Sequence, residues 1–348
     1  MRFAAITLSV LAGAAYITFA QTGNEPINGN WSLRLGETAG KLKLLLERST
    51  GKHHMSHSSD DVPRSQFVGL SSDQITSPNG GVVHFQISRE AGILECEGYL
   101  KAGGGGGIFH FMANLNYIAA MGSLGYRDLD HEKTFALSLH DVTTGYVRDM
   151  NALGYSDIKL DKLMAMRIHG VTPEFVKDIK AVGLEDTSLD KLIAYRIHGV
   201  SPDFVRQIKS LGFSKANGDQ YVSMRIHGVT PEFIRETRAQ GLSGADTIDH
   251  LVSMRTHGVT AEFVRDMKAQ GMDTNSVEKL VAYRIHGVSP DFVRQVKSMG
   301  FPKVTSDQLV AMRIHGVTPE FIQKMSSRGM KDLTIDQLVS LRIHGIAN

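Results

Sequence analysis

Hydrophobic residues recur every three or four positions through residues 113–348, which is the spacing of one face of an α-helix. In the representative segment Val171–Gly199, two such runs follow each other. They comprise Phe175, Val176, Ile179 and Val182, then Leu189, Leu192, Ile193 and Ile197. Gly183 between the runs and Gly199 after them suit the left-handed position that ends a helix. The segment therefore predicts two helices of about ten residues, the second starting near Thr187 or Ser188.

The residues that open each predicted hairpin are suited to helix initiation. Thr172 fits the N-cap, Pro173 the first helical position and Glu174 the first turn. Val171 and Val176 occupy the two positions of a hydrophobic staple. Helices this short are marginal alone in water, so we expect neighbouring hairpins to stabilise them by stacking.

A four-residue motif, Arg-x-His-Gly, precedes these initiation residues. Its copies are separated by 29 or 30 residues and begin at Arg167, Arg196, Arg225, Arg255, Arg284, Arg313 and Arg342. A period of this size is typical of stacked supersecondary units. With degenerate first copies included, about eight two-helix units of 29–30 residues are expected between Leu115 and His344.

Residues 27–112 follow a different pattern, with apolar residues at every second position. Trp31–Leu35 and Leu42–Leu46 alternate in this way. Further strands are expected at Val82–Ser88, Ile93–Leu100 and Ile108–Met112. Five or six short strands predict a small antiparallel sheet or sandwich.

The complete pattern predicts the fold class and the domain order. The class is α+β, with a small antiparallel β domain at 27–112 followed by an α-hairpin repeat solenoid at 113–348. Gly103–Gly107 lies between two predicted strands. Because no helix follows these glycines, we expect a flexible hairpin connection and not a phosphate-binding loop.

Composition excludes some functional classes. The 348 residues include 38 basic and 36 acidic ones, and the net charge of +2 gives no electrostatic case for binding nucleic acid. Met1–Ala20 has the basic start, apolar stretch and small-residue end of a secretory signal peptide, with an uncleaved anchor as the alternative. No later segment is apolar enough to span a membrane, so a periplasmic or secreted location is expected. Cys96, the one cysteine, is expected to fill a buried strand face.

Candidate chemistry is sparse. His53, His54 and His57, near Asp60 and Asp61, form the one local cluster with metal-ligand side chains. This polar segment is predicted to be a solvated loop, which makes the three histidines weak metal candidates. The sequence has neither the His-Glu-x-x-His nor the Gly-x-Ser-x-Gly motif. We therefore expect no enzyme activity and no cofactor.

The repeat motif itself allows two interpretations. The first is a structural joint in which each arginine forms an ion pair with the acid seven residues later. These pairs are Arg167–Glu174, Arg196–Asp203, Arg225–Glu232, Arg255–Glu262, Arg284–Asp291 and Arg313–Glu320.

The histidines of the motif are expected to cap helix C-termini. They are His169, His198, His227, His257, His286, His315 and His344. Helices packed about 8–10 Å apart keep neighbouring histidines from sharing one metal ion. In the second interpretation, exposed Arg and His edges form a periodic surface that reads a linear peptide or glycan.

The repeat Met166-Arg167-Ile168-His169-Gly170-Val171-Thr172-Pro173-Glu174-Phe175 and its copies resemble a repeat of uncharacterised secreted bacterial proteins. Similar repeats form C-terminal extensions of membrane metallopeptidases of the beta-lactam-sensor type. The segment from Trp31 to Phe85 resembles the β region that accompanies those repeats. The resemblance implies an exported repeat module. It does not imply peptidase activity, because the zinc motif and membrane helices of those enzymes are missing.

These observations favour a non-enzymatic scaffold that binds a protein or peptide partner in the cell envelope through its helical repeats. Two alternatives remain: a cell-envelope sensor of a glycan or small molecule, and an accessory or degenerate relative of the metallopeptidase assemblies. Binding specificity is expected in residues that differ between the copies.

Overall fold

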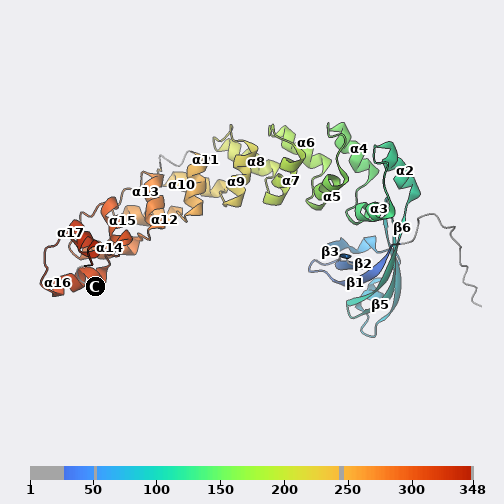
Figure 1. Ribbon diagram of the computed structural model, residues 1–348, viewed down its shortest axis with the longest axis horizontal. Helices are drawn as coiled ribbons and strands as arrows, with labels where there is room; N and C mark the ends of the chain where they lie inside the picture. The colour runs from blue at the N-terminus through green and yellow to red at the C-terminus, as the bar shows by residue number, and fades with distance from the viewer. Residues whose placement is uncertain (1–26, 51–52, 243–246, 346–348) are drawn as a thin grey trace, which may run out of the picture. The chain divides into compact units, whose positions relative to one another are not determined.

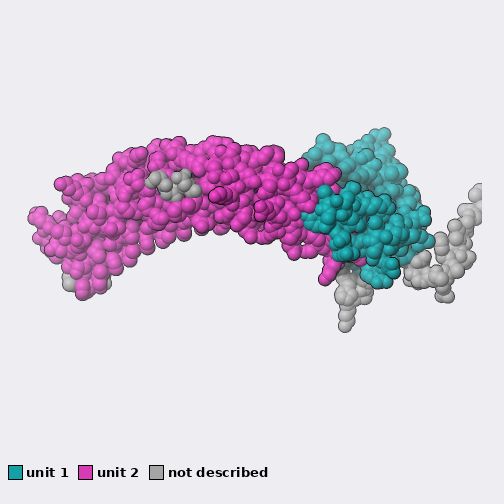
Figure 2. Space-filling model, turned by 90° about the horizontal axis from the view of Figure 1, so that it is seen from above, with its two compact units in different colours: residues 1–157 teal, residues 158–348 magenta. Residues whose placement is uncertain are grey.

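The computed structural model describes residues 27–50, 53–242 and 247–345 (Figure 1). The predicted signal peptide, residues 1–20, lies outside the described residues. The chain divides into two compact units, residues 1–157 and 158–348 (Figure 2). The first unit therefore continues past the domain boundary expected at 112/113 and includes three helices that follow the sheet.

The first unit contains one six-stranded antiparallel sheet with the strand order β3-β2-β1-β6-β5-β4. The strands are β1 (Ile27–Leu35), β2 (Lys41–Thr50), β3 (His53–Pro63), β4 (Gly81–Arg89), β5 (Gly92–Lys101) and β6 (Gly104–Ala113). The alternating apolar residues form one buried face, as Trp31 and Leu33 illustrate. Leu35, at the end of β1, is 55% exposed and lies outside this buried face. Cys96 is buried, as predicted, and burial raises the pKa of its thiol to about 12.

The glycine-rich segment is part of the sheet, and the expected flexible connection was wrong. Gly104–Gly107 pairs with β1 on one side and β5 on the other. The indole of Trp31 packs over this region, so a Cβ on Gly98 would lie 2.7 Å from its Cζ2 atom. A Cβ on Gly107 would collide with the main-chain carbonyl of Glu97. Glycine is needed here for close approach to Trp31 and to the neighbouring strands.

The segment expected to be a solvated loop is also a strand. β3 forms one edge of the sheet and pairs only with β2. Polar residues are common on edge strands because they discourage pairing with other chains. The predominance of His, Ser and Asp here removed the apolar alternation from which strands are usually predicted.

Sixteen helices follow the sheet among the described residues, in the order that eight hairpins require (Figure 1). Those of the first unit are α2 (Leu115–Ser123), α3 (His131–Leu139) and α4 (Thr144–Ala152). A short helix inside the sheet region, α1 (Ser72–Thr76), and the 3₁₀ turn η1 (Arg64–Gln66) were not predicted.

The second unit contains the remaining thirteen described helices. They are α5 (Leu160–Ile168), α6 (Pro173–Ala181), α7 (Leu189–His198), α8 (Pro202–Ser210), α9 (Gly218–Ile226), α10 (Pro231–Ala239), α11 (Ile248–Thr256), α12 (Ala261–Ala269), α13 (Val277–Ile285), α14 (Pro290–Ser298), α15 (Ser306–Ile314), α16 (Pro319–Ser327) and α17 (Ile335–Ile343). Along the described chain, no helix combines the length and apolar character needed to cross a membrane.

The predicted capping is confirmed. The side chain of Thr172 accepts a hydrogen bond from the Phe175 amide at 3.1 Å, and Pro173 opens α6. Gly183 has φ +75° directly after the C-cap of α6. In the second unit, odd-numbered helices pack on odd-numbered ones from α5 to α17, and α6 to α14 form a corresponding even-numbered series. Stacking therefore produces two layers of short helices.

The helix α3 explains why the first unit extends beyond the sheet. Its Phe135 ring stacks on Phe109 at a centroid distance of 5.8 Å and lies 5.0 Å from Phe111. All three rings are buried. The first helices of the repeat series thus complete the core of the β domain.

Candidate functional site

In α7 and the odd-numbered helices after it, the motif arginine contacts the turn that opens its own hairpin. In α7, Nε of Arg196 donates a hydrogen bond to the carbonyl oxygen of His169 at 3.2 Å. Its guanidinium lies over the Phe175 ring, 5.1 Å from the centroid. His169 is the C-cap of α5, so the cation meets the negative end of that helix. The ring contact recurs for Arg225, Arg255, Arg284 and Arg313 with Phe204, Phe233, Phe263 and Phe292. The bond to a histidine carbonyl recurs for Arg225, Arg284 and Arg313.

This packing explains the glycine of the motif. Gly170 has φ +69°, a conformation that disfavours side chains. A Cβ at this position would also lie 2.8 Å from Nη2 of Arg196. Gly199 and Arg225 are related in the same way. The arginine and the glycine of successive copies therefore fit against each other.

Among the described residues, the acids do not pair with Arg196, Arg225, Arg255, Arg284 or Arg313, so the hypothesis of an inter-helix ion pair was wrong at these five junctions. Four of the five acids instead contact an arginine three positions later on their own helix. These pairs are Asp203–Arg206, Glu232–Arg235, Glu262–Arg265 and Asp291–Arg294. The motif arginine is turned toward the preceding helix end, and the acid lies on the exposed first turn of its own helix.

Two further acids of the repeat interact with their own N-cap. Thr172 hydrogen-bonds Glu174 and Thr318 hydrogen-bonds Glu320, and together with bonds from the main chain these contacts lower the pKa of each carboxyl. The acids therefore favour the start of each even-numbered helix. Arg167, the motif arginine that precedes Glu174 in the sequence, lies in α5.

A second set of cations ties the even-numbered helices together. Nζ of Lys209 in α8 donates to the carbonyl oxygen of Val182, the C-cap of α6, at 2.6 Å. Nη1 of Arg238 donates to the Leu211 carbonyl at 2.7 Å. In both layers, therefore, a cationic side chain donates a hydrogen bond to the C-terminus of the preceding helix of that layer. The bond satisfies a carbonyl that has no partner within its own helix.

The variable residue of the motif forms an exposed apolar row. It is isoleucine in six copies and Thr256 in the seventh. The isoleucines are between 53% and 57% exposed and comprise Ile168, Ile197, Ile226, Ile285, Ile314 and Ile343. We call this row, with Thr256, the isoleucine band. The expected burial of Ile197 was wrong because the inner face of α7 is supplied by Leu192 and Tyr195.

One turn earlier on these helices, further partly exposed residues widen the isoleucine band. Ile193 and Ala194 in α7, and Val281 and Ala282 in α13, are partly exposed. In the copy with threonine, Oγ1 of Thr256 lies 3.1 Å from Nδ1 of His227 in the preceding odd-numbered helix. The band position of one helix is therefore beside the motif histidine of the helix before it.

The motif histidines lie at helix ends, as predicted. Six of them are C-cap residues, and His198 is the last residue of α7. Five are exposed, and His198 and His286 are partly exposed. Nδ1 of His344 lies 2.8 Å from the Ser340 carbonyl oxygen, the kind of capping contact expected. The exposed Arg and His edges that a periodic binding surface requires are present.

Charge is distributed unequally along the two edges of the isoleucine band. At the N-terminal ends of the odd-numbered helices, charges pair between neighbours, as in Lys162–Asp190 and Lys191–Asp219. At the other edge, no described carboxylate lies within 4.0 Å of the guanidinium nitrogens of Arg196, Arg225, Arg255, Arg284 or Arg313. These guanidinium groups are therefore not neutralised by a described carboxylate, in contrast to the lysines at the other edge.

No protein-family model matches this chain, and no curated protein matches it significantly. The exposed motif surface is therefore interpreted from its geometry.

The first copy of the motif differs because the sheet covers it. Ser138 replaces the arginine and is buried, and Leu139 packs against the hydrophobic core of the β domain. Asp141 replaces the glycine and keeps a positive φ of +51°. Next to them, the rings of His140 and His57 meet edge to face at 5.1 Å. The degenerate copy is thus adapted to contact with protein.

The predicted metal candidates are only partly described. His57 lies on β3, and its Nε2 is 3.1 Å from Oγ of Ser59. The side chains of His53 and His54 lie outside the described set. Within the described residues, no three His, Cys, Asp or Glu side chains are arranged to hold a metal ion.

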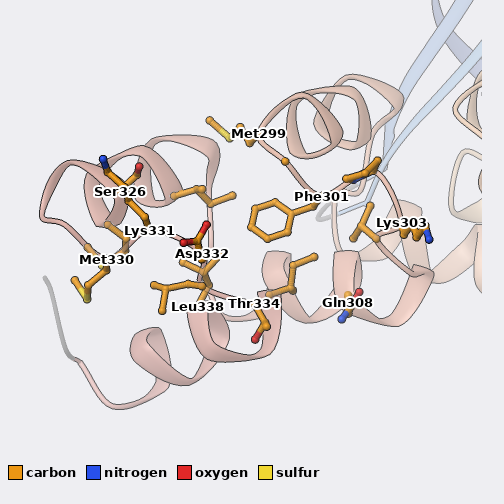
Figure 3. Close-up of a pocket in the computed structure, with 17 residues that line it drawn as sticks. Met299, Phe301, Lys303, Gln308, Ser326, Met330, Lys331, Asp332, Thr334 and Leu338 are labelled. Carbon is orange, nitrogen blue, oxygen red and sulfur yellow. The ribbon is translucent and has the colours of Figure 1, made fainter.

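The last two hairpins enclose a recess of about 720 Å³ (Figure 3). Phe301, Met330 and Leu338 supply apolar lining, and Lys303 and Asp332 add charge. In Figure 3 the Phe301 ring points into the space between the two hairpins. The recess suits an apolar group with a polar edge, and its described lining includes no nucleophile paired with a general base.

Proposed function

We propose that this protein is an exported, non-enzymatic scaffold that binds a polypeptide through the isoleucine band. The observation that carries this proposal is the repetition of a half-exposed isoleucine on one helix of each hairpin. Single exposed apolar residues are ordinary, but a row of them on successive packed helices forms a continuous apolar surface.

A polypeptide partner fits this surface better than a glycan. Sugar rings are usually bound against aromatic side chains, and the described band positions hold only Ile, Val, Ala, Met, Ser and Thr. The tyrosines on the same helices, Tyr195, Tyr221 and Tyr283, are buried. Burying aliphatic side chains of a partner would contribute about 25 cal/mol for each Å² of apolar surface removed from water.

A peptide-display selection tests the proposal. The wild-type chain and a variant with Ile197→Thr, Ile226→Thr and Ile285→Thr would be presented to the same random library. Thr256 shows that the repeat accepts threonine at this position. We expect peptides that bind the wild type and lose binding to the variant. Equal enrichment on both proteins, or no enrichment, would overturn the proposal.

A further inference from the structure

We infer that the isoleucine band recognises an extended, acidic polypeptide in the polyproline II conformation, with an apolar side chain at every third residue. This inference rests on the proposed function and specifies the ligand. Three observations support it: the spacing of the odd-numbered helices, the absence of a described carboxylate beside Arg196, Arg225 and Arg284, and the way in which the first copy is already covered.

The spacing favours a ligand with a period of three residues. The odd-numbered helices pack directly on one another, and packed helices lie about 8–10 Å apart. A polyproline II helix has three residues per turn and rises ~3.1 Å per residue, so the same side recurs every ~9 Å. A β-strand alternates its side chains, so every third one faces the opposite way. The polyproline II ligand therefore places one apolar side chain against each successive isoleucine.

The charge favours acidic residues between the apolar ones. The guanidinium groups of Arg196, Arg225 and Arg284 are exposed, and each uses Nε to bond a carbonyl oxygen. Their remaining N–H groups have no described carboxylate within 4.0 Å. Arginine binds carboxylates well because its planar fork can donate two parallel hydrogen bonds. The edge at the N-terminal ends of these helices should attract acidic residues less strongly, because Lys162 and Lys191 already pair with Asp190 and Asp219.

The first copy shows that this face can be covered by protein. At the band position of α3, Leu139 packs on the apolar core of the sheet. The adjacent Ser138 is buried, where an arginine would lose its hydration. From α5 onward, arginine returns at the corresponding positions with isoleucine, or with Thr256 in α11, beside it, and these residues are accessible. The corresponding face of the second unit is therefore open.

Fluorescence anisotropy with synthetic peptides tests the ligand. The probe is a labelled peptide of seven Leu-Pro-Glu triplets, one for each motif copy. A peptide with Lys in place of Glu tests charge, and a peptide of identical composition in scrambled order, without Leu at every third position, tests period. We expect at least about tenfold weaker binding for each control. Equal binding of all three peptides would overturn the inference.

The threonine copy offers a gain-of-function test with the same probe. Thr256→Ile fills the gap in the isoleucine band and should tighten binding several-fold, whereas Ile226→Thr should weaken it by a similar factor. Exposed substitutions of this kind should leave the circular dichroism and urea midpoint unchanged, which serves as the folding control. Unchanged affinity in both variants would overturn the inference.

The two experiments fail in distinguishable ways. If display peptides depend on the isoleucines but share neither acidity nor the period of three, the ligand inference fails and the proposed function stands. If no peptide binding depends on the isoleucines, both fail. A concentration-dependent dimer of the wild type, abolished by the three Ile→Thr changes in sedimentation experiments, would identify the band as a contact between copies and overturn both.

Discussion

Arg225 donates a hydrogen bond from Nε to the main-chain carbonyl oxygen of His198 at 3.3 Å. The two residues are 27 positions apart and belong to successive motif copies. His198 ends α7, and Arg225 lies in the last turn of α9. Arg196 bonds the carbonyl of His169 in the same way, so the motif copy Arg196-Ile197-His198 supplies an arginine to the copy before it and a carbonyl to the copy after it. This reciprocal use explains why the arginine and the Gly turn recur with the same period.

Replacing Arg225 with methionine should destabilise the second unit. The change removes a charge-assisted bond to His198 and the contact with the Phe204 ring, 5.0 Å from the arginine Cζ atom. We expect a loss of about 1–2 kcal/mol in the free energy of unfolding. Urea unfolding followed by circular dichroism measures it. Arg206→Met is the control, since its exposed pair with Asp203 should contribute well under 1 kcal/mol. Equal effects of the two changes would contradict this role of Arg225.

Replacing Gly199 with alanine should cost more stability than replacing Gly241 with alanine. Both glycines have positive φ, +70° and +75°. A Cβ on Gly199 would lie 2.8 Å from Nη2 of Arg225, whereas a Cβ on Gly241 has nothing within 4 Å. We expect about 1 kcal/mol for the backbone at both sites, and a further loss at Gly199 as Arg225 is displaced.

A double-mutant cycle checks the origin of that difference. In an Arg225→Met background, the cost of Gly199→Ala should fall toward that of Gly241→Ala. If the cost of Gly199→Ala is the same in both backgrounds, the arginine is not its cause.

Replacing Gly107 with alanine should disrupt the sheet. The added methyl would collide with the Glu97 carbonyl between two paired strands, and neither strand can move without losing its ladder. We expect a destabilisation of about 3 kcal/mol or more. The fluorescence of Trp31, the single tryptophan, reports unfolding of the first unit. Gly81→Ala in β4 is the matched control: its Cβ meets nothing within 4 Å, so stability should change by less than about 1 kcal/mol. Similar stability of the two variants would refute the steric argument.

The first unit should lose stability as the pH falls below about 6.5. Burial lowers the pKa of both His57 and His140, and His140 lowers that of His57 further. The unfolded chain then binds more protons than the folded one, so stability is complete above the unfolded pKa and declines below it.

Trp31-monitored urea unfolding between pH 7.5 and 5 measures this effect. His140→Gln should flatten the profile, and the exposed His315→Gln should leave its slope unchanged. A profile that is equally steep without His140 would exclude the histidine pair as its cause.

The sequence by itself determined the elements and their order. Thr172, Pro173 and Gly183 specify the ends of α6 through local hydrogen bonds and local backbone geometry, so the hairpins and their period were predictable. The alternation of Leu42, Leu44 and Leu46 likewise specified a strand with one buried face. These features depend on residues close together in the chain.

Only the tertiary structure decided the roles of residues whose partners are distant. The sequence placed Arg196 beside Asp203, but packing brings it to His169, 27 positions away. It predicted a flexible hairpin connection at Gly103–Gly107, whereas pairing with two flanking strands makes Gly104–Gly107 part of the sheet. The exposure of Ile197 could have been suspected, because an isoleucine recurs between Arg and His in six copies. Helical periodicity placed Ile197 on the apolar face of its helix, which suggests burial. Only the stacking of successive helices showed which face of each helix remains open to solvent.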